Sequence, residues 1–121
     1  MKKIVLLLIC AVSLFSCSQK PKDLIVKTWQ IKDVTIPNQT MSDSDKAKIL
    51  KGTIEFTKDG KMIIRGMGDD QTGNYTLSED GKTLTVVTNG KSEDNTVEDL
   101  TSSKLVLTSK NDGGKLTAVP K

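Results

Sequence analysis

Three tight-turn motifs built on Asp and Gly limit the folds open to this sequence. They read KDGK at 58–61, EDGK at 79–82 and NDGG at 111–114. Glycine accepts the positive φ angles of hairpin turns, and segments that alternate apolar and polar residues flank the motifs. This pattern is typical of antiparallel strands joined by short turns. It predicts an all-β domain, either a sandwich or a barrel.

About eight strands follow from this pattern, with turn signals roughly every 8 to 12 residues. The first strand is expected over 24–36. Its apolar residues change parity between Ile31 and Val34, so a bulge is expected near Asp33. A polar loop is expected over 89–94. The remaining strands are expected at 53–57, 62–65, 74–77, 83–87, 96–101, 105–108 and 116–119.

One short helix is expected after the first strand, from about Ser42 to Lys51. Ser and Asp residues at 42–45 favour a helix N-terminus, where acids complement the helix dipole. Gly52 then ends the segment. A helix this short is not stable alone, so we expect it to lie across one end of the sheet structure.

The N-terminus reads as a signal peptide over 1–16. Two lysines precede an apolar run that is too short to span a bilayer, and Ser16-Cys17 resembles a bacterial lipobox. Phe15 is bulkier than the usual residue at its position, and an ordinary signal peptide that contains a cysteine is the alternative. We expect Cys17 to be lipidated with acyl chains such as palmitate, 17–23 to contain the lipidated residue and a tether, and 24–121 to form the domain.

The composition removes most catalytic chemistry. The chain has no histidine, and Cys10 lies in the signal, so the mature chain has no thiol besides Cys17. Without Lys2 and Lys3, 16 basic residues face 15 acidic ones, which excludes a nucleic-acid footprint. Acidic pairs such as 69–70 fit solvated turns better than a metal or catalytic site. We therefore expect no cofactor and no metal.

Several weak sequence fragments occur in an order and spacing that resemble a known family. They are Trp29 in the first strand, 54–56 with 58–60, 73–77 and 105–107. Together they resemble the lipocalin-like domains of Gram-negative lipoproteins. The resemblance covers 24–119 and implies an up-and-down β-barrel of about eight strands.

Two positions depart from the lipocalin pattern. Lipocalins usually read Gly-x-Trp at the first strand, and here Lys27 occupies the glycine position. They also place an arginine late in the barrel, against the tryptophan, whereas the single arginine here is Arg65. These departures weaken the inference of a lipocalin-type ligand pocket.

The expected interior is filled by side chains, with a shallow pocket at one barrel mouth near Met67 and the loop 66–70. Candidate ligand contacts are Trp29, Phe56, Met67 and Tyr75, although a tryptophan in this position is more often a core plug. The residues expected to face inward are Trp29, Ile31, Ile54, Phe56, Met62, Ile64, Tyr75, Leu77, Leu84, Val86, Val97, Leu105, Leu107 and Leu116.

Two functions remain open from the sequence. One is a non-catalytic lipoprotein that binds a small apolar ligand in its barrel. The other is an envelope module or inhibitor that binds a protein partner through strand edges and loops. An enzyme is the weakest reading. The residues that follow Cys17 include no acidic run, so we expect attachment to the outer membrane on its periplasmic side.

Overall fold

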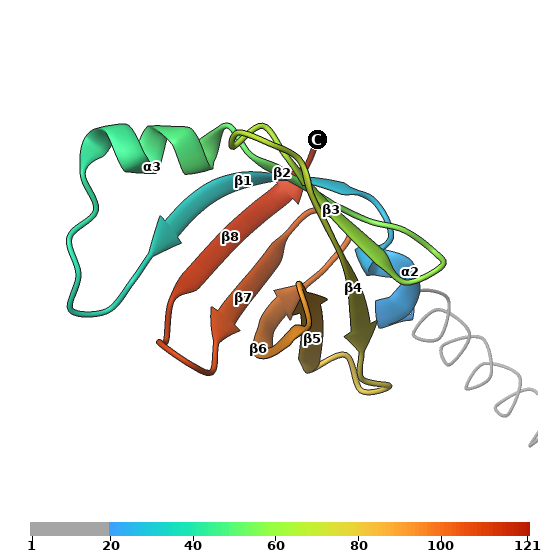
Figure 1. The fold of residues 1–121 in the computed structure, drawn as a ribbon. Coiled ribbons are helices and arrows are strands. Elements are labelled where there is room, and N and C mark those ends of the chain that lie inside the picture. The colour runs from blue at the N-terminus through green and yellow to red at the C-terminus, as the bar shows by residue number, and fades with distance from the viewer. Residues whose placement is uncertain (1–19) are drawn as a thin grey trace, which may run out of the picture.

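A computed structural model describes residues 20–121 of the chain; the predicted signal peptide and Cys17 lie outside these residues. The described chain forms a closed barrel of eight antiparallel strands, each paired with the next in sequence, and β8 pairs back with β1 (Figure 1). The predicted all-β up-and-down barrel is confirmed. The strands are β1 (Thr28–Thr35), β2 (Thr53–Phe56), β3 (Lys61–Arg65), β4 (Gln71–Leu77), β5 (Thr83–Thr88), β6 (Lys91–Leu100), β7 (Leu105–Ser109) and β8 (Lys115–Pro120).

The predicted bulge in β1 is present. Ile31 pairs with Ala118, but the next pair is Asp33 with Thr117, so the register against β8 shifts by one residue. The extra residue returns Val34 to the inner face of the barrel, opposite Leu116.

The predicted helix is also present, as α3 (Asp43–Leu50). The Ser42 hydroxyl caps its N-terminus by accepting a hydrogen bond of 3.2 Å from the Asp45 amide. At its other end, the Gln30 amide nitrogen donates to the carbonyl oxygens of Leu50 and Gly52, at 2.8 and 3.0 Å. These bonds hold the end of α3 against β1.

A second helix, α2 (Pro21–Ile25), was not predicted. The sequence suggested a tether over 17–23 and a strand from residue 24, because Leu24-Ile25-Val26 is an apolar run. Proline suits the first turn of a helix, and Asp23 there complements the helix dipole. Ile25 is fully buried at the barrel end, which fixes the helix by tertiary packing. Among the described helices, none is both long and apolar enough to cross a bilayer.

The predicted polar loop at 89–94 is wrong, because β6 already begins at Lys91. Asn89 and Gly90 form a two-residue turn, with φ angles of 52° and 78°. Positive φ at both positions characterises the type I′ hairpin, for which Asn-Gly is a preferred sequence. The first residues of β6 are polar and exposed, so their hydrophobic pattern gave no strand signal.

The inner face of the barrel is lined by apolar side chains, as predicted. Every residue expected to face inward belongs to the core or packs against it. Ile25 from α2 and Ala118 from β8 complete the core and were not predicted. Trp29, Leu84 and Leu105 are fully buried.

Candidate functional site

Helix α2 closes one end of the barrel, the end that carries the β2–β3, β4–β5 and β6–β7 turns (Figure 1). The indole nitrogen of buried Trp29 donates to the Ile25 carbonyl oxygen at 3.0 Å. On the outer side, a Cβ on Gly81 would lie 2.6 Å from Pro21 Cγ, so the β4–β5 turn presses directly on the helix. We call this the α2 end.

The opposite end carries α3 and the loop 66–70. Inward-facing residues near it, such as Ile64, Val86 and Leu116, are partly exposed. Met67 lies over Gly52, where an added Cβ would meet its Cγ at 2.6 Å, and its side chain is 39% exposed. A small surface pocket of about 260 Å³ lies between residues 34–41 and Lys46 of α3.

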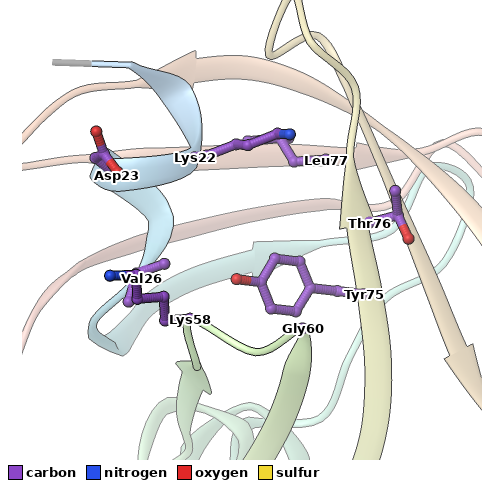
Figure 2. Close-up of a pocket in the computed structure, with 8 residues that line it drawn as sticks. All are labelled: Lys22, Asp23, Val26, Lys58, Gly60, Tyr75, Thr76 and Leu77. Atoms are coloured by element: carbon purple, nitrogen blue, oxygen red, sulfur yellow. The ribbon is translucent and has the colours of Figure 1, made fainter.

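A larger pocket, of about 540 Å³, lies at the α2 end (Figure 2). Three segments distant in sequence enclose it: α2 with the residue that follows it, the β2–β3 turn, and the end of β4. The lining residues are Lys22, Asp23, Val26, Lys58, Gly60, Tyr75, Thr76 and Leu77.

The pocket joins an apolar wall to two cationic side chains. Val26, Leu77 and the ring of Tyr75 supply the apolar surface. In Figure 2 the Tyr75 ring projects from β4 toward the α2 side, and the Lys22 side chain extends toward Leu77.

Lys58 borders the pocket from the β2–β3 turn. Gly60 adopts φ 91° there, and its amide donates to the Thr57 carbonyl at 3.2 Å. The Thr57 hydroxyl hydrogen-bonds to the Asp59 carboxylate, which lowers the pKa of that carboxyl. The side chain of Asp59 is therefore fixed within the turn as an anion. Lys58 stands exposed beside it.

Tyr75 presents its ring to the pocket while its hydroxyl is already engaged. The hydroxyl donates to the Thr57 carbonyl oxygen at 2.6 Å. The ring contacts Phe56 edge-to-face, with centroids 4.9 Å apart. Burial, and then the nearby Asp59 carboxylate, raise the pKa of Tyr75 above its ordinary value. Tyr75 is thus a neutral wall residue, and Lys22 and Lys58 supply the cationic groups of the pocket.

Comparison with known proteins fits this geometry. A model of the lipocalin-like domain family matches residues 25–107, more than half of the chain. The chain belongs to this family. No curated protein matches the sequence.

Two solved structures share the fold of the lipocalin-like domain. A lipocalin-like protein from Bacteroides uniformis superposes with a TM-score of 0.61 at 19% identity, covering 80% of this chain and 98% of the other. A DUF4847 family protein from Bacteroides vulgatus superposes with a TM-score of 0.58 at 11% identity, covering 79% and 93%. At these identities the likeness concerns the fold alone.

In this lipocalin-like domain, Lys27 stands where the family pattern has a glycine and also supplies the cation expected from an arginine. Lys27 occupies the expected glycine position, and its Nζ lies 5.0 Å from the centre of the Trp29 ring. The same Nζ donates to the Ser102 carbonyl oxygen at 3.2 Å. The Arg65 guanidinium is instead paired with Glu55 at 2.6 Å. Lys27 therefore supplies the cation that lipocalins take from an arginine.

Of the four residues proposed from the sequence as ligand contacts of the lipocalin-like domain, one lines the pocket. Tyr75 lines it, and Phe56 lies behind Tyr75 in the core. Trp29 is fully buried as a core plug, and Met67 lies at the opposite end. The larger pocket is therefore not at the mouth near Met67, where the sequence suggested one.

No sequence pattern marked Lys22 and Lys58 as site residues. Each is an ordinary exposed lysine in a segment rich in charges. Their shared position follows from the docking of α2, which the sequence did not predict. Among residues 20–121 no three acidic side chains gather as a cation site would require.

Proposed function

We propose that this protein is a membrane-anchored lipoprotein whose lipocalin-like barrel binds a compact ligand without catalysing a reaction. The pocket at the α2 end carries this proposal. The inward-facing apolar side chains pack together as one core, which disfavours a long apolar ligand inside the barrel. The pocket of about 540 Å³ outside that core has the mixed lining that small-molecule sites use.

The lining selects a ligand with an apolar body and an anionic group. Val26, Leu77 and the Tyr75 ring would cover the body, at about 25 cal/mol for each Å² of apolar area removed from water. The ammonium groups of Lys22 and Lys58 would bind the anion as point charges. Asp23 also borders the pocket, but its side chain points away from it in Figure 2.

The available acids and bases support binding rather than catalysis. The chain has no histidine. Hydrogen bonds lower the pKa values of Asp59 and Asp80, so these carboxyls are ionised over the physiological range and do not suit general-acid chemistry. The pKa of Tyr75 moves upward, away from the range that a general base requires.

The alternative of an envelope module that binds a protein partner has less support. Such a module is expected to expose a contiguous apolar patch. Within residues 20–121 the exposed large apolar side chains are Met67 and Val87.

Ligand binding is tested with the mature chain carrying Cys17→Ser, which removes the lipid. Titration with decanoate by calorimetry is expected to give binding that Lys58→Glu weakens. Lys110→Glu, an equal charge change at an exposed residue of the β7–β8 turn, serves as the control. Absence of decanoate binding by the parent, or equal loss in both variants, contradicts the proposed pocket.

The anchor is tested separately in cells. Cys17→Ser is expected to move the protein from the membrane to the soluble fraction, and to remove the acyl mass from the mature N-terminus. Separation of the two bacterial membranes, with protease added to intact cells, then tests the expected periplasmic side of the outer membrane. Membrane fractionation that is unchanged by the substitution contradicts lipid anchoring.

A further inference from the structure

We infer that the pocket at the α2 end takes its ligand from the bilayer that anchors the chain, and that this ligand is an anionic phospholipid. The inference rests on the proposed function, since it requires both the lipid on Cys17 and a working pocket. It specifies the ligand class and the orientation of the barrel on the membrane.

The first support is the length of the chain between the lipid and the barrel. Lys20 precedes α2 directly and lies three residues after Cys17. A fully extended chain covers at most about 3.6 Å per residue, so this segment reaches about 11 Å. A lipid on Cys17 therefore holds α2 close to the headgroups. The pocket wall begins two residues further along, at Lys22.

The second support is the orientation that this short connection imposes. With α2 at the bilayer, the three turns at the α2 end approach the headgroups. The opposite end, with α3 and Met67, points away from the membrane (Figure 1). The pocket, which α2 and the β2–β3 turn enclose, then opens in the headgroup region.

The third support is the distribution of lysines. Lys20 and Lys22 are exposed at α2, and each of the three turns at this end adds an exposed lysine: Lys58, Lys82 and Lys104. Basic residues near an anionic leaflet are attracted to it within a Debye length.

Acidic residues share this end. Two of them form hydrogen bonds within their own turns. Asp59 accepts a hydrogen bond from the Thr57 hydroxyl, and Asp80 accepts one from the Lys82 amide at 3.0 Å. Asp23 and Glu79 are exposed as well. The five lysines at α2 and the three turns therefore exceed the four acids of the same segments by one, and two of those acids are hydrogen-bonded within their own loops.

The pocket also fits the chemistry of an anionic phospholipid. Its phosphate would lie between Lys22 and Lys58, and its glycerol and first acyl carbons would lie against Val26, Leu77 and the Tyr75 ring. The Tyr75 hydroxyl is engaged with Thr57, so the anion depends on the two lysines. A zwitterionic headgroup brings its own ammonium into this cationic site and binds less well.

The test uses the mature chain with Cys17→Ser and two kinds of vesicle. One contains phosphatidylcholine alone, and the other replaces part of it with phosphatidylglycerol. Flotation is expected to recover the parent chain with the phosphatidylglycerol vesicles and not with the others. The double variant Lys22→Gln/Lys58→Gln is expected to bind these vesicles at least about tenfold more weakly than the parent, because two positive charges near the membrane surface are lost. Thermal melts establish that this double variant, and the control variant described next, are folded.

The control removes the same charge from the opposite end. Lys110→Gln/Lys115→Gln changes two exposed lysines of the β7–β8 region and is expected to retain vesicle binding. Equal loss in both double variants would show attraction by net charge alone and overturn the inference. Added glycerol phosphate at the concentration of the lipid is expected to leave flotation unchanged. If it displaces the vesicles, the site binds a free phosphate ester and the membrane source is wrong.

Failure of the inference is separable from failure of the proposed function. Decanoate binding that Lys58→Glu abolishes, together with absence of flotation on phosphatidylglycerol vesicles, leaves the pocket intact and overturns the membrane source. Absence of both decanoate and vesicle binding overturns both. Flotation of the parent and the control, but not of the pocket variant, supports both.

Discussion

The indole nitrogen of Trp29 donates a hydrogen bond of 3.0 Å to the carbonyl oxygen of Ile25, and both residues are fully buried. The carbonyl belongs to the last residue of α2, where a helix leaves backbone acceptors without partners. The Trp29 side chain, which comes from β1, therefore provides a donor for this carbonyl oxygen at the end of α2, and the same hydrogen bond holds the indole in place in the barrel core.

Two substitutions of Trp29 are expected to destabilise the fold to different extents. Trp29→Phe leaves the buried Ile25 carbonyl without its donor, at a cost of about 1–3 kcal/mol in the free energy of unfolding. Trp29→Ala removes most of the buried volume as well and is expected to cost about 3–5 kcal/mol. Urea melts of the parent and both variants measure these values. Identical midpoints for all three would contradict the core role of Trp29.

Lys27→Met tests the cation above Trp29. Methionine keeps an unbranched apolar stem one atom shorter than lysine, but removes the charge and the hydrogen bond to Ser102. We expect a loss of about 0.5–1 kcal/mol, the range of a partly exposed cation–π contact. The same variant is expected to shift the emission of Trp29, the single tryptophan of the chain. Lys32→Met, on the exposed part of β1, is the matched control and should leave the emission unchanged.

Gly73→Ala tests the close approach of two strands. A Cβ at this buried position of β4 would lie 2.5 Å from the Val87 carbonyl oxygen and 2.6 Å from Thr88 Cγ2. Because one of these atoms belongs to the backbone, the strand must shift, and we expect a loss of about 1–3 kcal/mol. Chemical denaturation measures the loss. Asn74→Ala, an exposed neighbour on the same strand, should change stability by much less. A Gly73→Ala variant as stable as the parent would contradict the predicted contact.

Tyr75 gives the fold a predicted dependence on alkaline pH. Folding raises the pKa of this phenol, so the folded chain holds the proton more tightly than the unfolded chain. This contribution to stability is complete below the unfolded value of about 10 and is lost as the pH rises through the folded pKa. Tyr75 is the single tyrosine, so phenolate absorbance titrates it directly. The midpoint in buffer should lie above the midpoint in concentrated urea. Equal midpoints would contradict the effect of burial.

The parts of the fold that were predictable from sequence depend on local chemistry. Asp-Gly turns fix hairpins through backbone conformations that a few residues determine, and the Ser42 cap marks a helix start in the same way. The parity change after Ile31 located the bulge, since the core must contact one face of the strand.

The parts that were missed depend on distant contacts or on a polar pattern. Leu24-Ile25-Val26 fits a strand as well as a helix, and only the barrel end that Ile25 seals decides between them. The polar start of β6 carried no hydrophobic signal, although Asn89-Gly90 marked the turn. The pocket joins α2, Lys58 and Tyr75, and this grouping exists once α2 has docked.

Closure of the sheet between β1 and β8 has a consequence for how the protein is made. The first and last strands of the domain hydrogen-bond along most of their length, from Trp29 with Pro120 to Thr35 with Lys115. The barrel therefore cannot close until β8 has been synthesised, and until then β1 lacks one of its two partner strands. Pairing of segments so far apart in sequence also makes folding slow relative to helical domains of similar size.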